Sequence, residues 1–391
     1  MNILLANTTK MVADTGGLAK MTSAFANEMQ RRGHTVSLVY SDEKKGAFYY
    51  PLDAGIPAYD IRHFMGECIR YPLYMKFKRE LYRLFSKRKA RTVNNDFAEK
   101  FLLKNLKQVV DQVNPDVIVS YQPAASKMLL CDLNFQIPVI TMSHGDPEDY
   151  FHIYPVAEIP ALEKSAVCQV LLPSFAQHIH NHLPNAKTVV IGNAVPQYKE
   201  QADLQTVKEH YTIVFVGRLT KNHKRPHLLV KAFSLLAEEY PDWQVELWGD
   251  MDRRAYYEEL KLLIRNNNLQ DRVFLKGTSK EIPKVLQRCD IFAFPSAYEG
   301  FGLALGEAMS MGLPAVGYRN CSAVNELIKD GVNGFLCEDG IDDLAEKLKK
   351  LMESRELRIT MGQAARESMK QYAPEAIWDE WEALLKSYAK E

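Results

Sequence analysis

Two kinds of apolar pattern alternate along the first half of the chain. The run NILLAN (2–7) is short and almost wholly apolar, whereas segment 16–33 repeats its apolar residues every three or four positions until Gly33. Short apolar runs predict buried strands, and the longer spacing predicts helices. Their alternation favours a doubly wound parallel sheet. The other strands expected in this half are TVSLVY (35–40), PDVIVSY (115–121), PVITMSH (138–144), CQVLLPS (168–174) and TVVIGN (188–193).

The pattern stops over the polar segment 195–210 and then begins again. We therefore expect two α/β domains, 1–200 and 201–373, with a cleft between them. The last segment, 374–391, reads as a helix whose apolar stripe needs a surface to cover. The elements expected in the second domain are the strands YTIVFVG (211–217), WQVELWG (243–249), RVFLKG (272–277), DIFAFPS (290–296) and LPAVGY (313–318), with a helix over 226–240.

Composition narrows the class of protein without identifying it. The 391 residues carry a formal net charge of +0, so no global field points to nucleic acid or to acidic substrates. The six cysteines form no C-x-x-C pair, which disfavours a zinc site or a disulfide framework. The N-terminus has no basic, apolar leader, and no apolar run approaches about 18 residues. We expect a cytoplasmic protein with free thiols.

The loop GRLTKNHKRP follows the first strand of the second domain, and ligands of open α/β sheets bind at such strand ends. Arg218 offers a planar fork to a phosphate, and Lys224 offers a mobile charge six residues later. Together they are suited to neutralise a diphosphate. A solvated basic loop explains the same residues equally well.

The stretch SAYEGFGLALGEAM places two carboxylates around a glycine-rich helix start. Glu299 precedes the helix and Glu307 lies one to two turns inside it. The amides of Phe301, Gly302 and Leu303 form an anion site at the helix N-terminus. Two acids that hold sugar hydroxyls, with amides between them for phosphates, explain this pattern better than two solvated acids do.

Weaker signals lie at strand ends of the first domain. Gly16 and Gly17 begin a helix and let the backbone approach an anionic ligand, although a plain turn explains them as well. His144 ends a strand and is followed by Gly145 and acidic residues. It either points into the cleft or caps the next element.

Taken together, these motifs resemble the retaining glycosyltransferases of the GT-B fold, family 4 type. The resemblance spans nearly the whole chain and is strongest over 211–340, where GRL precedes a lysine and two glutamates are separated by seven residues. It implies two Rossmann-like domains facing a cleft, with a C-terminal helix crossing back to the N-domain. The implied catalytic residues are His144, Arg218, Lys224 and Glu299, and the implied donor-binding residues are Gly16, Gly17, Gly277, Ile282, Phe301, Gly302, Leu303 and Glu307.

The resemblance also implies an activity. The first domain would bind the acceptor, and the second would bind a nucleotide sugar, most simply a UDP-sugar. The sugar would pass with retention, without a metal ion or other cofactor, to a saccharide or lipid-linked saccharide in surface polysaccharide, lipopolysaccharide or capsule biosynthesis. A sugar-nucleotide epimerase, a phosphorylase or a non-catalytic partner subunit of the same fold are the rivals. The single Gly249 after strand 243–249 and the segment VVIGNAVPQY depart from the usual family pattern.

An insert at about 62–113 carries the chain's densest positive charge. Residues 66–91 hold nine lysines and arginines against two acids, with aromatic and aliphatic residues interleaved. A basic amphipathic helix of this kind is typical of binding to an anionic membrane surface. A helix with one face in the core and one solvated basic face fits equally well. Nucleic-acid binding has no fold to support it.

Overall fold

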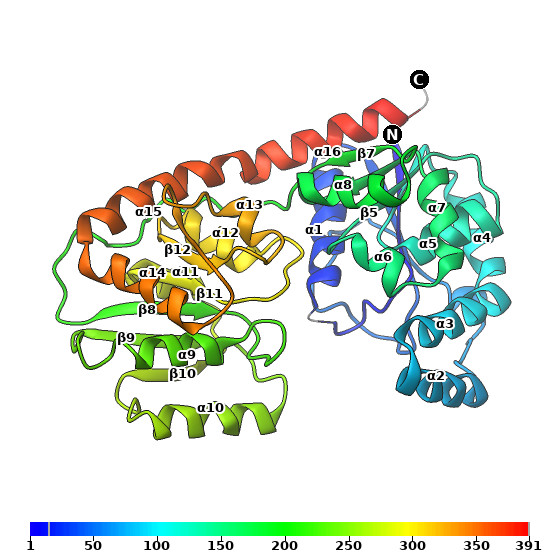
Figure 1. Ribbon diagram of the computed structural model, residues 1–391. Coiled ribbons are helices and arrows are strands. Elements are labelled where there is room, and N and C mark those ends of the chain that lie inside the picture. The colour runs from blue at the N-terminus through cyan, green and yellow to red at the C-terminus, as the bar shows by residue number, and fades with distance from the viewer. Residues whose placement is uncertain (15, 390–391) are drawn as a thin grey trace. The chain divides into compact units, whose positions relative to one another are not determined.

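The computed structural model describes residues 1–14 and 16–389. The chain forms two compact units (Figure 1). Unit 1 is Met1–Ile191 together with the C-terminal segment from Trp378, and unit 2 is Gly192–Ile377. The linker expected at 195–210 therefore lies within unit 2. None of the helices in the described residues combines the length and apolar character needed to cross a bilayer.

Unit 1 is built on a parallel sheet of seven strands in the order β3-β2-β1-β4-β5-β6-β7. β1 and β2 pair from Asn2 opposite Thr35, and β4 pairs with β1 on its other side. The inner strands are buried because helices cover both faces, which explains their apolar runs. The strands are β1 Asn2–Asn7, β2 Thr35–Tyr40, β3 Ala58–Asp60, β4 Val117–Ser120, β5 Val139–Met142, β6 Val167–Val170 and β7 Thr188–Val190.

The basic insert forms three helices rather than one. Ser86 ends α2, and its side chain accepts a hydrogen bond from the Lys89 amide at the start of α3. The helices of unit 1 are α1 Gly17–Arg31, α2 Leu73–Phe85, α3 Lys87–Phe101, α4 Leu103–Val113, α5 Pro123–Lys127, α6 Glu148–His152, α7 Ile159–Lys164 and α8 Pro173–His182, with the short turns η1 Phe64–Gly66, η2 Met128–Asp132 and η3 Val156–Glu158.

Unit 2 repeats the architecture with six parallel strands in the order β10-β9-β8-β11-β12-β13. They are β8 Tyr211–Val216, β9 Trp243–Trp248, β10 Val273–Gly277, β11 Ile291–Phe294, β12 Ala315–Tyr318 and β13 Gly334–Cys337. The helices are α9 Pro226–Ser234, α10 Arg254–Asn266, α11 Ile282–Arg288, α12 Leu303–Ser310, α13 Val324–Leu327, α14 Ile341–Glu353, α15 Arg355–Met369 and α16 Pro374–Tyr388, with η4 Lys370–Tyr372 before α16.

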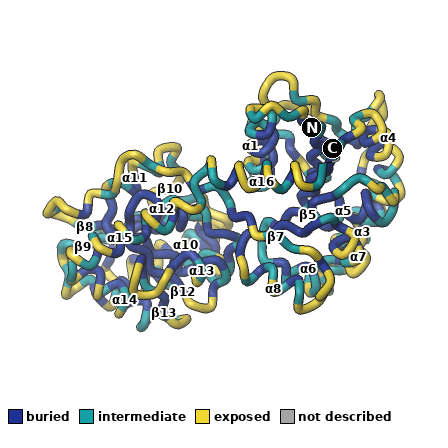
Figure 2. The backbone as a smooth tube through the Cα atoms, turned by 90° about the horizontal axis from the view of Figure 1, so that it is seen from above, coloured by how far each residue is buried: buried dark blue, intermediate teal, exposed yellow. Residues whose placement is uncertain are grey.

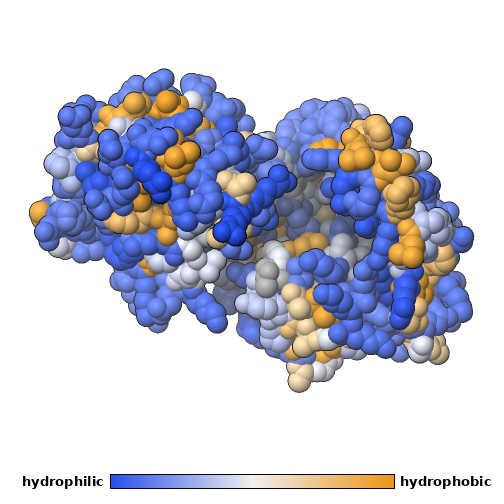
Figure 3. All heavy atoms as spheres, turned by 90° about the horizontal axis from the view of Figure 1, so that it is seen from below, coloured by the Kyte–Doolittle hydropathy of each residue, from blue (hydrophilic) through white to orange (hydrophobic). Residues whose placement is uncertain are grey.

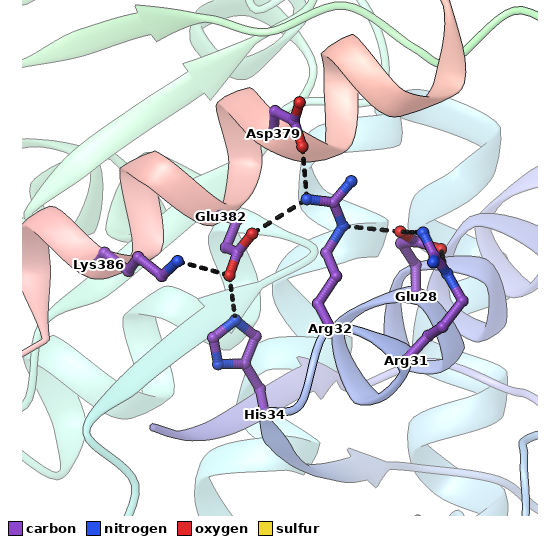
Figure 4. Close-up of polar contacts among 7 residues, drawn as sticks. All are labelled: Glu28, Arg31, Arg32, His34, Asp379, Glu382 and Lys386. Carbon is purple, nitrogen blue, oxygen red and sulfur yellow. Dashed lines mark hydrogen bonds and ion pairs between the residues drawn. The ribbon is translucent and has the colours of Figure 1, made fainter.

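From Trp378 onward, α16 belongs to unit 1 and packs on α1. The rings of Trp378 and Trp381 lie edge-on to Phe25 of α1, with centroids 5.7 and 5.0 Å away. Beside them, Arg32 bridges Asp379 at 2.6 Å and Glu382 at 3.0 Å (Figure 4). The prediction of a terminal helix that crosses back to the N-domain is confirmed. The apolar stripe of this helix, which includes both tryptophans, covers part of α1.

The structure differs from the predicted elements mainly at their ends. β1 and β2 match their predicted ranges, but the expected strand 168–174 ends at Val170 because Pro173 begins α8. The short strands β3 and β13 were missing from the prediction. Figure 2 shows that burial concentrates on the strands, while exposed residues lie on the outer helices and loops.

Candidate functional site

A cavity of about 710 Å³ in unit 2 brings together three of the predicted catalytic residues. It lies beyond the carboxyl ends of β8 and β11, where an open parallel sheet binds its ligands. Arg218 and Lys224 come from the loop after β8, and Glu299 comes from the loop after β11. The turn after β9 also lies against the start of the β8 loop, because a Cβ on Gly249 would lie 1.9 Å from the Gly217 carbonyl oxygen.

Arg225, which the sequence analysis did not select, ties the two loops together. Its backbone is left-handed, with φ of 47°. Its Nε donates to the Pro295 carbonyl at 3.0 Å, and Nη1 lies 2.9 Å from Asp339. The His223 carbonyl also accepts a hydrogen bond from the Ala297 amide at 2.7 Å. No sequence signal predicts this, because a residue before proline normally adopts an extended backbone.

Lys224 and Glu299 form an ion pair inside this cavity. The Lys224 Nζ lies 2.5 Å from a carboxylate oxygen of Glu299 and 4.7 Å from the centroid of the Phe294 ring. The Glu299 side chain is 8% exposed and that of Lys224 is 22% exposed. Each charge therefore fixes the position of the other beside the carboxyl end of β11. The low exposure of the two side chains strengthens their attraction.

The three residues of the predicted anion site lie at the start of α12. Gly302 precedes the helix with φ of 80°, a left-handed conformation that glycine adopts without strain. Phe301 is buried and lies edge-on to Tyr372 at 5.1 Å. Leu303 is the first residue of α12.

Glu307 lies farther along α12 and does not line the unit 2 cavity in the described chain. Burial, followed by the charge of Glu307, raises the pKa of Tyr198 to about 12, which places this carboxylate near the Tyr198 hydroxyl.

Two of the implied donor-binding residues, Gly277 and Ile282, lie at the edge of the same sheet. Gly277 ends β10 with φ of 70° and is exposed, and its carbonyl accepts a hydrogen bond from the Gly249 amide at 2.7 Å. Ile282 is the first residue of α11 and is half-buried. The Gly277 bond joins the turn after β10 to the turn after β9.

His144 belongs to unit 1 and follows β5. Its ring stacks on Tyr121 with centroids 5.5 Å apart. The Nε2 atom is enclosed and has no hydrogen-bond partner among residues 1–14 and 16–389. Burial lowers the pKa of His144 to about 4, so the ring is neutral near neutrality.

Gly16 and Gly17 also belong to unit 1. Gly16 caps α1, and its amide donates to Asp14 at 3.1 Å. A Cβ on Gly17 would meet no atom within 4 Å, so its surroundings are open. α1 is 15 residues long, and its N-terminal amides carry the positive end of the helix dipole.

One group of residues has the composition of a metal site. Glu148, His152 and His182 place their ligand atoms within 4.8 Å of one another. Each histidine Nε2 lies 2.8 Å from the same Glu148 oxygen, and these contacts account for the arrangement without an ion. The group does not line the unit 2 cavity, and we assign no catalytic metal to it.

Comparisons with known proteins bear on the family and the fold of the chain. Residues 196–368 match the family described as Glycosyl transferases group 1. An uncharacterized glycosyltransferase of Haemophilus influenzae is 33% identical over 179 residues, or 45% of this chain, and the chain spans about half of that protein's length (49%). The amylovoran biosynthesis glycosyltransferase AmsD of Erwinia amylovora is 24% identical over 96% of this chain and 97% of its own length.

A solved structure supports the fold over the entire chain. A mutant of S. aureus TarM, in complex with fondaparinux, alpha-GlcNAc-glycerol and UDP, superposes with a TM-score of 0.73. The two share 16% identity over 98% of this chain and 100% of that one. Such low identity indicates the fold alone, which is GT-B: two Rossmann-like domains with parallel sheets.

Proposed function

We propose that this protein, which belongs to the group 1 glycosyl transferases through residues 196–368, transfers a sugar from a UDP-sugar to a saccharide or lipid-linked saccharide during surface polysaccharide assembly. The observation that carries the proposal is the convergence of Arg218, Lys224 and Glu299 on one cavity at the carboxyl ends of β8 and β11. The amylovoran relative supports the choice of pathway, and the UDP bound to TarM supports the choice of nucleotide.

The ion pair in the cavity suggests how a donor binds. Lys224 and Glu299 neutralise each other when no ligand is present. A diphosphate brings negative charge to Lys224, with Arg218 as its second cation, and so releases the Glu299 carboxylate. Glu299 then accepts hydrogen bonds from hydroxyls of the transferred sugar. The leaving diphosphate would be stabilised by these two cations rather than by a metal ion.

We propose the following roles for the other residues that the resemblance implied. The amides of Phe301, Gly302 and Leu303 bind phosphate oxygens, and Glu307 holds the ribose hydroxyls. Gly277 and Ile282 border the base. From unit 1, His144 contacts the donor sugar, and Gly16 and Gly17 approach the phosphates with their amides. We assign no enzymic nucleophile, and we propose that the anomeric configuration is retained.

Nucleotide binding tests the donor site. We expect UDP, among UDP, GDP, ADP, CMP and TDP, to raise the melting temperature selectively. Arg218→Ala/Lys224→Ala should weaken UDP binding about a hundredfold in calorimetry, because two charge-assisted contacts are lost. Lys231→Ala removes an exposed charge from neighbouring α9 and serves as the control. Folded protein that binds none of the five would contradict the proposal, as would equal weakening in the control.

We further propose that the protein works at the anionic inner face of the plasma membrane, through α2. Only Met75 of this helix is buried and Tyr82 is half-buried, whereas six of its large apolar residues are exposed. The alternative of a helix with a substantial core face is therefore weakened. The exposed stripe consists of Leu73, Tyr74, Phe77, Leu81, Leu84 and Phe85, which are 43–82% exposed. Figure 3 shows a hydrophobic band over the part of unit 1 where α2 lies.

The basic residues around this stripe favour a membrane over a protein partner. Residues 66–91 carry nine basic side chains against two acidic ones, which complements anionic lipid head groups. We expect cosedimentation with phosphatidylglycerol vesicles that weakens with salt, and no cosedimentation with phosphatidylcholine vesicles. Leu84→Ser/Phe85→Ser should abolish it. Leu235→Ser/Leu262→Ser changes two exposed leucines of unit 2 and should have no effect. Equal binding by both double variants would refute membrane docking through α2.

A further inference from the structure

Two helices of unit 1 meet through side chains that are common metal ligands. Glu148 and His152 lie four residues apart on α6, and His178 and His182 lie four residues apart on α8. Residues with this spacing share one face of a helix, so each helix offers a pair of such side chains. Glu148, His152 and His182 place their ligand atoms within 4.8 Å of one another, as described above.

This group is separate from the cavities of the molecule. Unit 1 has a large cavity, of about 890 Å³, beyond the carboxyl ends of β1 and β2, and its wall includes Arg91, Tyr154 and Glu158. Among the described residues, the three members of the group line neither this cavity nor the cavity of unit 2. A ligand of the group would therefore be distinct from the nucleotide sugar.

The Glu148 carboxylate is the centre of the group. One of its oxygens, Oε1, lies 2.8 Å from Nε2 of His152 and 2.8 Å from Nε2 of His182. The two imidazole rings are nearly perpendicular, at 82°, with their centroids 6.0 Å apart. Two ring nitrogens and a carboxylate oxygen thus converge on one point. When both imidazoles are neutral, the group carries one negative charge, which favours a cation.

Surrounding contacts fix the orientation of these side chains. The Glu148 amide donates a hydrogen bond to Asp146 at 2.9 Å, and the same Asp146 oxygen lies 2.6 Å from Nδ1 of His178. The His182 ring stacks on the Phe151 ring, with centroids 4.0 Å apart and an angle of 17° between the planes. Metal ligands are commonly oriented by such outer contacts, which lower the entropy that binding has to cost.

The types of ligand atom select the class of metal. Imidazole nitrogen suits Zn²⁺, Cu²⁺ and Ni²⁺, whereas Mg²⁺ and Ca²⁺ prefer oxygen ligands. Zn²⁺ holds nitrogen and oxygen ligands at about 2.0–2.2 Å in a tetrahedron, which places the ligand atoms about 3.4 Å apart. The contacts of 2.8 Å would therefore open by about 0.6 Å on binding. The His152 side chain is 64% exposed and that of Glu148 is 36% exposed, so both have room for this shift.

We propose that Glu148, His152 and His182 bind Zn²⁺ or a related transition-metal dication, with a water molecule as the fourth ligand. The ion joins α6 to α8. It thereby fixes the segment between β5 and α6, which carries His144 four residues before Glu148. The ion takes no part in sugar transfer, and the inference does not depend on the proposed function.

Calorimetry of the full chain with ZnCl₂ and with MgCl₂ tests the site. We expect one equivalent of Zn²⁺ to bind and Mg²⁺ to give no heat of binding at the same concentration. His182→Ala should weaken Zn²⁺ binding by about tenfold or more, because even the outer contacts of a metal site contribute about tenfold to affinity. His210→Ala removes an exposed histidine of unit 2 and should leave binding unchanged.

Hydrogen exchange tests whether the ion joins the two helices. With Zn²⁺ at ten times its dissociation constant, the amides of 143–152 that exchange by opening of the site should exchange about tenfold more slowly. The same concentration should have no effect on these amides in His182→Ala. Unchanged exchange in the wild type with Zn²⁺ bound would contradict the joining of α6 to α8.

Three further outcomes would overturn the inference. Absence of Zn²⁺ binding by the folded wild type would exclude the site. Equal affinity of His182→Ala and the wild type would indicate an adventitious ion only, as would equal weakening by His210→Ala. If His182→Ala does not fold, His152→Ala replaces it, because the His152 side chain is largely exposed.

Discussion

The two cavities share a place in the fold and differ in how their charges are satisfied. Both lie at the carboxyl ends of parallel strands. In unit 2, Lys224 and Glu299 neutralise each other at 2.5 Å. In unit 1, Arg91 lies over the Tyr154 ring and forms no ion pair within the described chain, although its charge acts on Glu158. One oxygen of Glu158 is buried without a hydrogen-bond partner among the described residues. The buried carboxylate of the unit 2 cavity thus has a cationic partner, whereas one oxygen of the buried carboxyl in unit 1 has no hydrogen-bond partner among the described residues.

This difference bears on how each cavity would respond to a ligand. A ligand in unit 2 must compete with an ion pair, so affinity depends on what replaces each partner. A ligand in unit 1 supplies partners that are missing, so binding there should stabilise the fold directly. The predictions below test that contrast, beginning with the largest effect.

Substitutions of Lys224 and Glu299 in unit 2 should have strongly coupled effects on the free energy of unfolding. Lys224→Met leaves the Glu299 carboxylate buried and unpaired, which should lower the free energy of unfolding by about 3 kcal/mol. The double variant Lys224→Met/Glu299→Leu removes both charges and should recover most of that loss. Urea unfolding of the wild type and the variants measures it. Additive effects of the two substitutions would mean that the pair has no energetic role.

Glu158 should make the wild type less stable as pH rises. Burial raises its pKa to about 7 from an ordinary 4.5, so the folded state holds a proton that the unfolded state has lost between these values. Stability therefore falls from pH 4.5 to 7, by up to about 3 kcal/mol. Glu158→Gln should remove this fall and be more stable than the wild type at pH 8. The exposed neighbour Glu163→Gln is the control, and parallel pH profiles would contradict the assignment.

His144 should make the wild type less stable as pH falls, which is the opposite dependence to that of Glu158. Its pKa is lowered to about 4, so the unfolded state binds a proton between pH 6.5 and 4 that the folded state does not. Stability therefore falls as pH decreases through this window, by about 2 kcal/mol after allowance for partial exposure. Thermal melts of His144→Gln should show a smaller acid loss than the wild type, whereas those of the exposed control His210→Gln should not differ.

The smallest change in the free energy of unfolding is expected from substitutions on the exposed face of α2. Leu84→Ser and Phe85→Ser change side chains that are 78% and 80% exposed, so each should alter the free energy of unfolding by less than about 0.5 kcal/mol. Met75→Ala, on the buried face, should cost about 2 kcal/mol or more. Thermal or urea melts compare them. A destabilisation by the serine variants equal to that of Met75→Ala would show that the stripe belongs to the fold.

Sequence patterns predicted the fold and the unit 2 cavity far better than they predicted the unit 1 cavity. The strands that became β1, β2 and β8 are mostly apolar runs bounded by polar segments, so the hydrophobic pattern alone located them. The unit 2 residues cluster in two short motifs at strand ends, which a linear reading can find. Glu158 and Arg91 of unit 1 are 67 positions apart and carry no motif. Only the packing of α3 and η3 against the sheet brings them to one wall.

The sequence also did not predict what surrounds certain side chains. The pattern of α2 left open whether its apolar face meets the core or solvent, because periodicity gives a stripe but not its partner. The left-handed backbone of Arg225 contradicts the usual preference before proline, and it is set by contacts with Pro295 and Asp339.

One titration tests the central claim most directly, namely that a donor diphosphate takes Lys224 from Glu299. UDP and a UDP-sugar that binds the wild type are titrated into wild type and Glu299→Gln. The account predicts that Glu299→Gln binds UDP more tightly, because Lys224 is no longer neutralised, and that the sugar-dependent gain in affinity is reduced. Unchanged or weaker UDP binding by a folded Glu299→Gln protein, with the sugar-dependent gain intact, would contradict it.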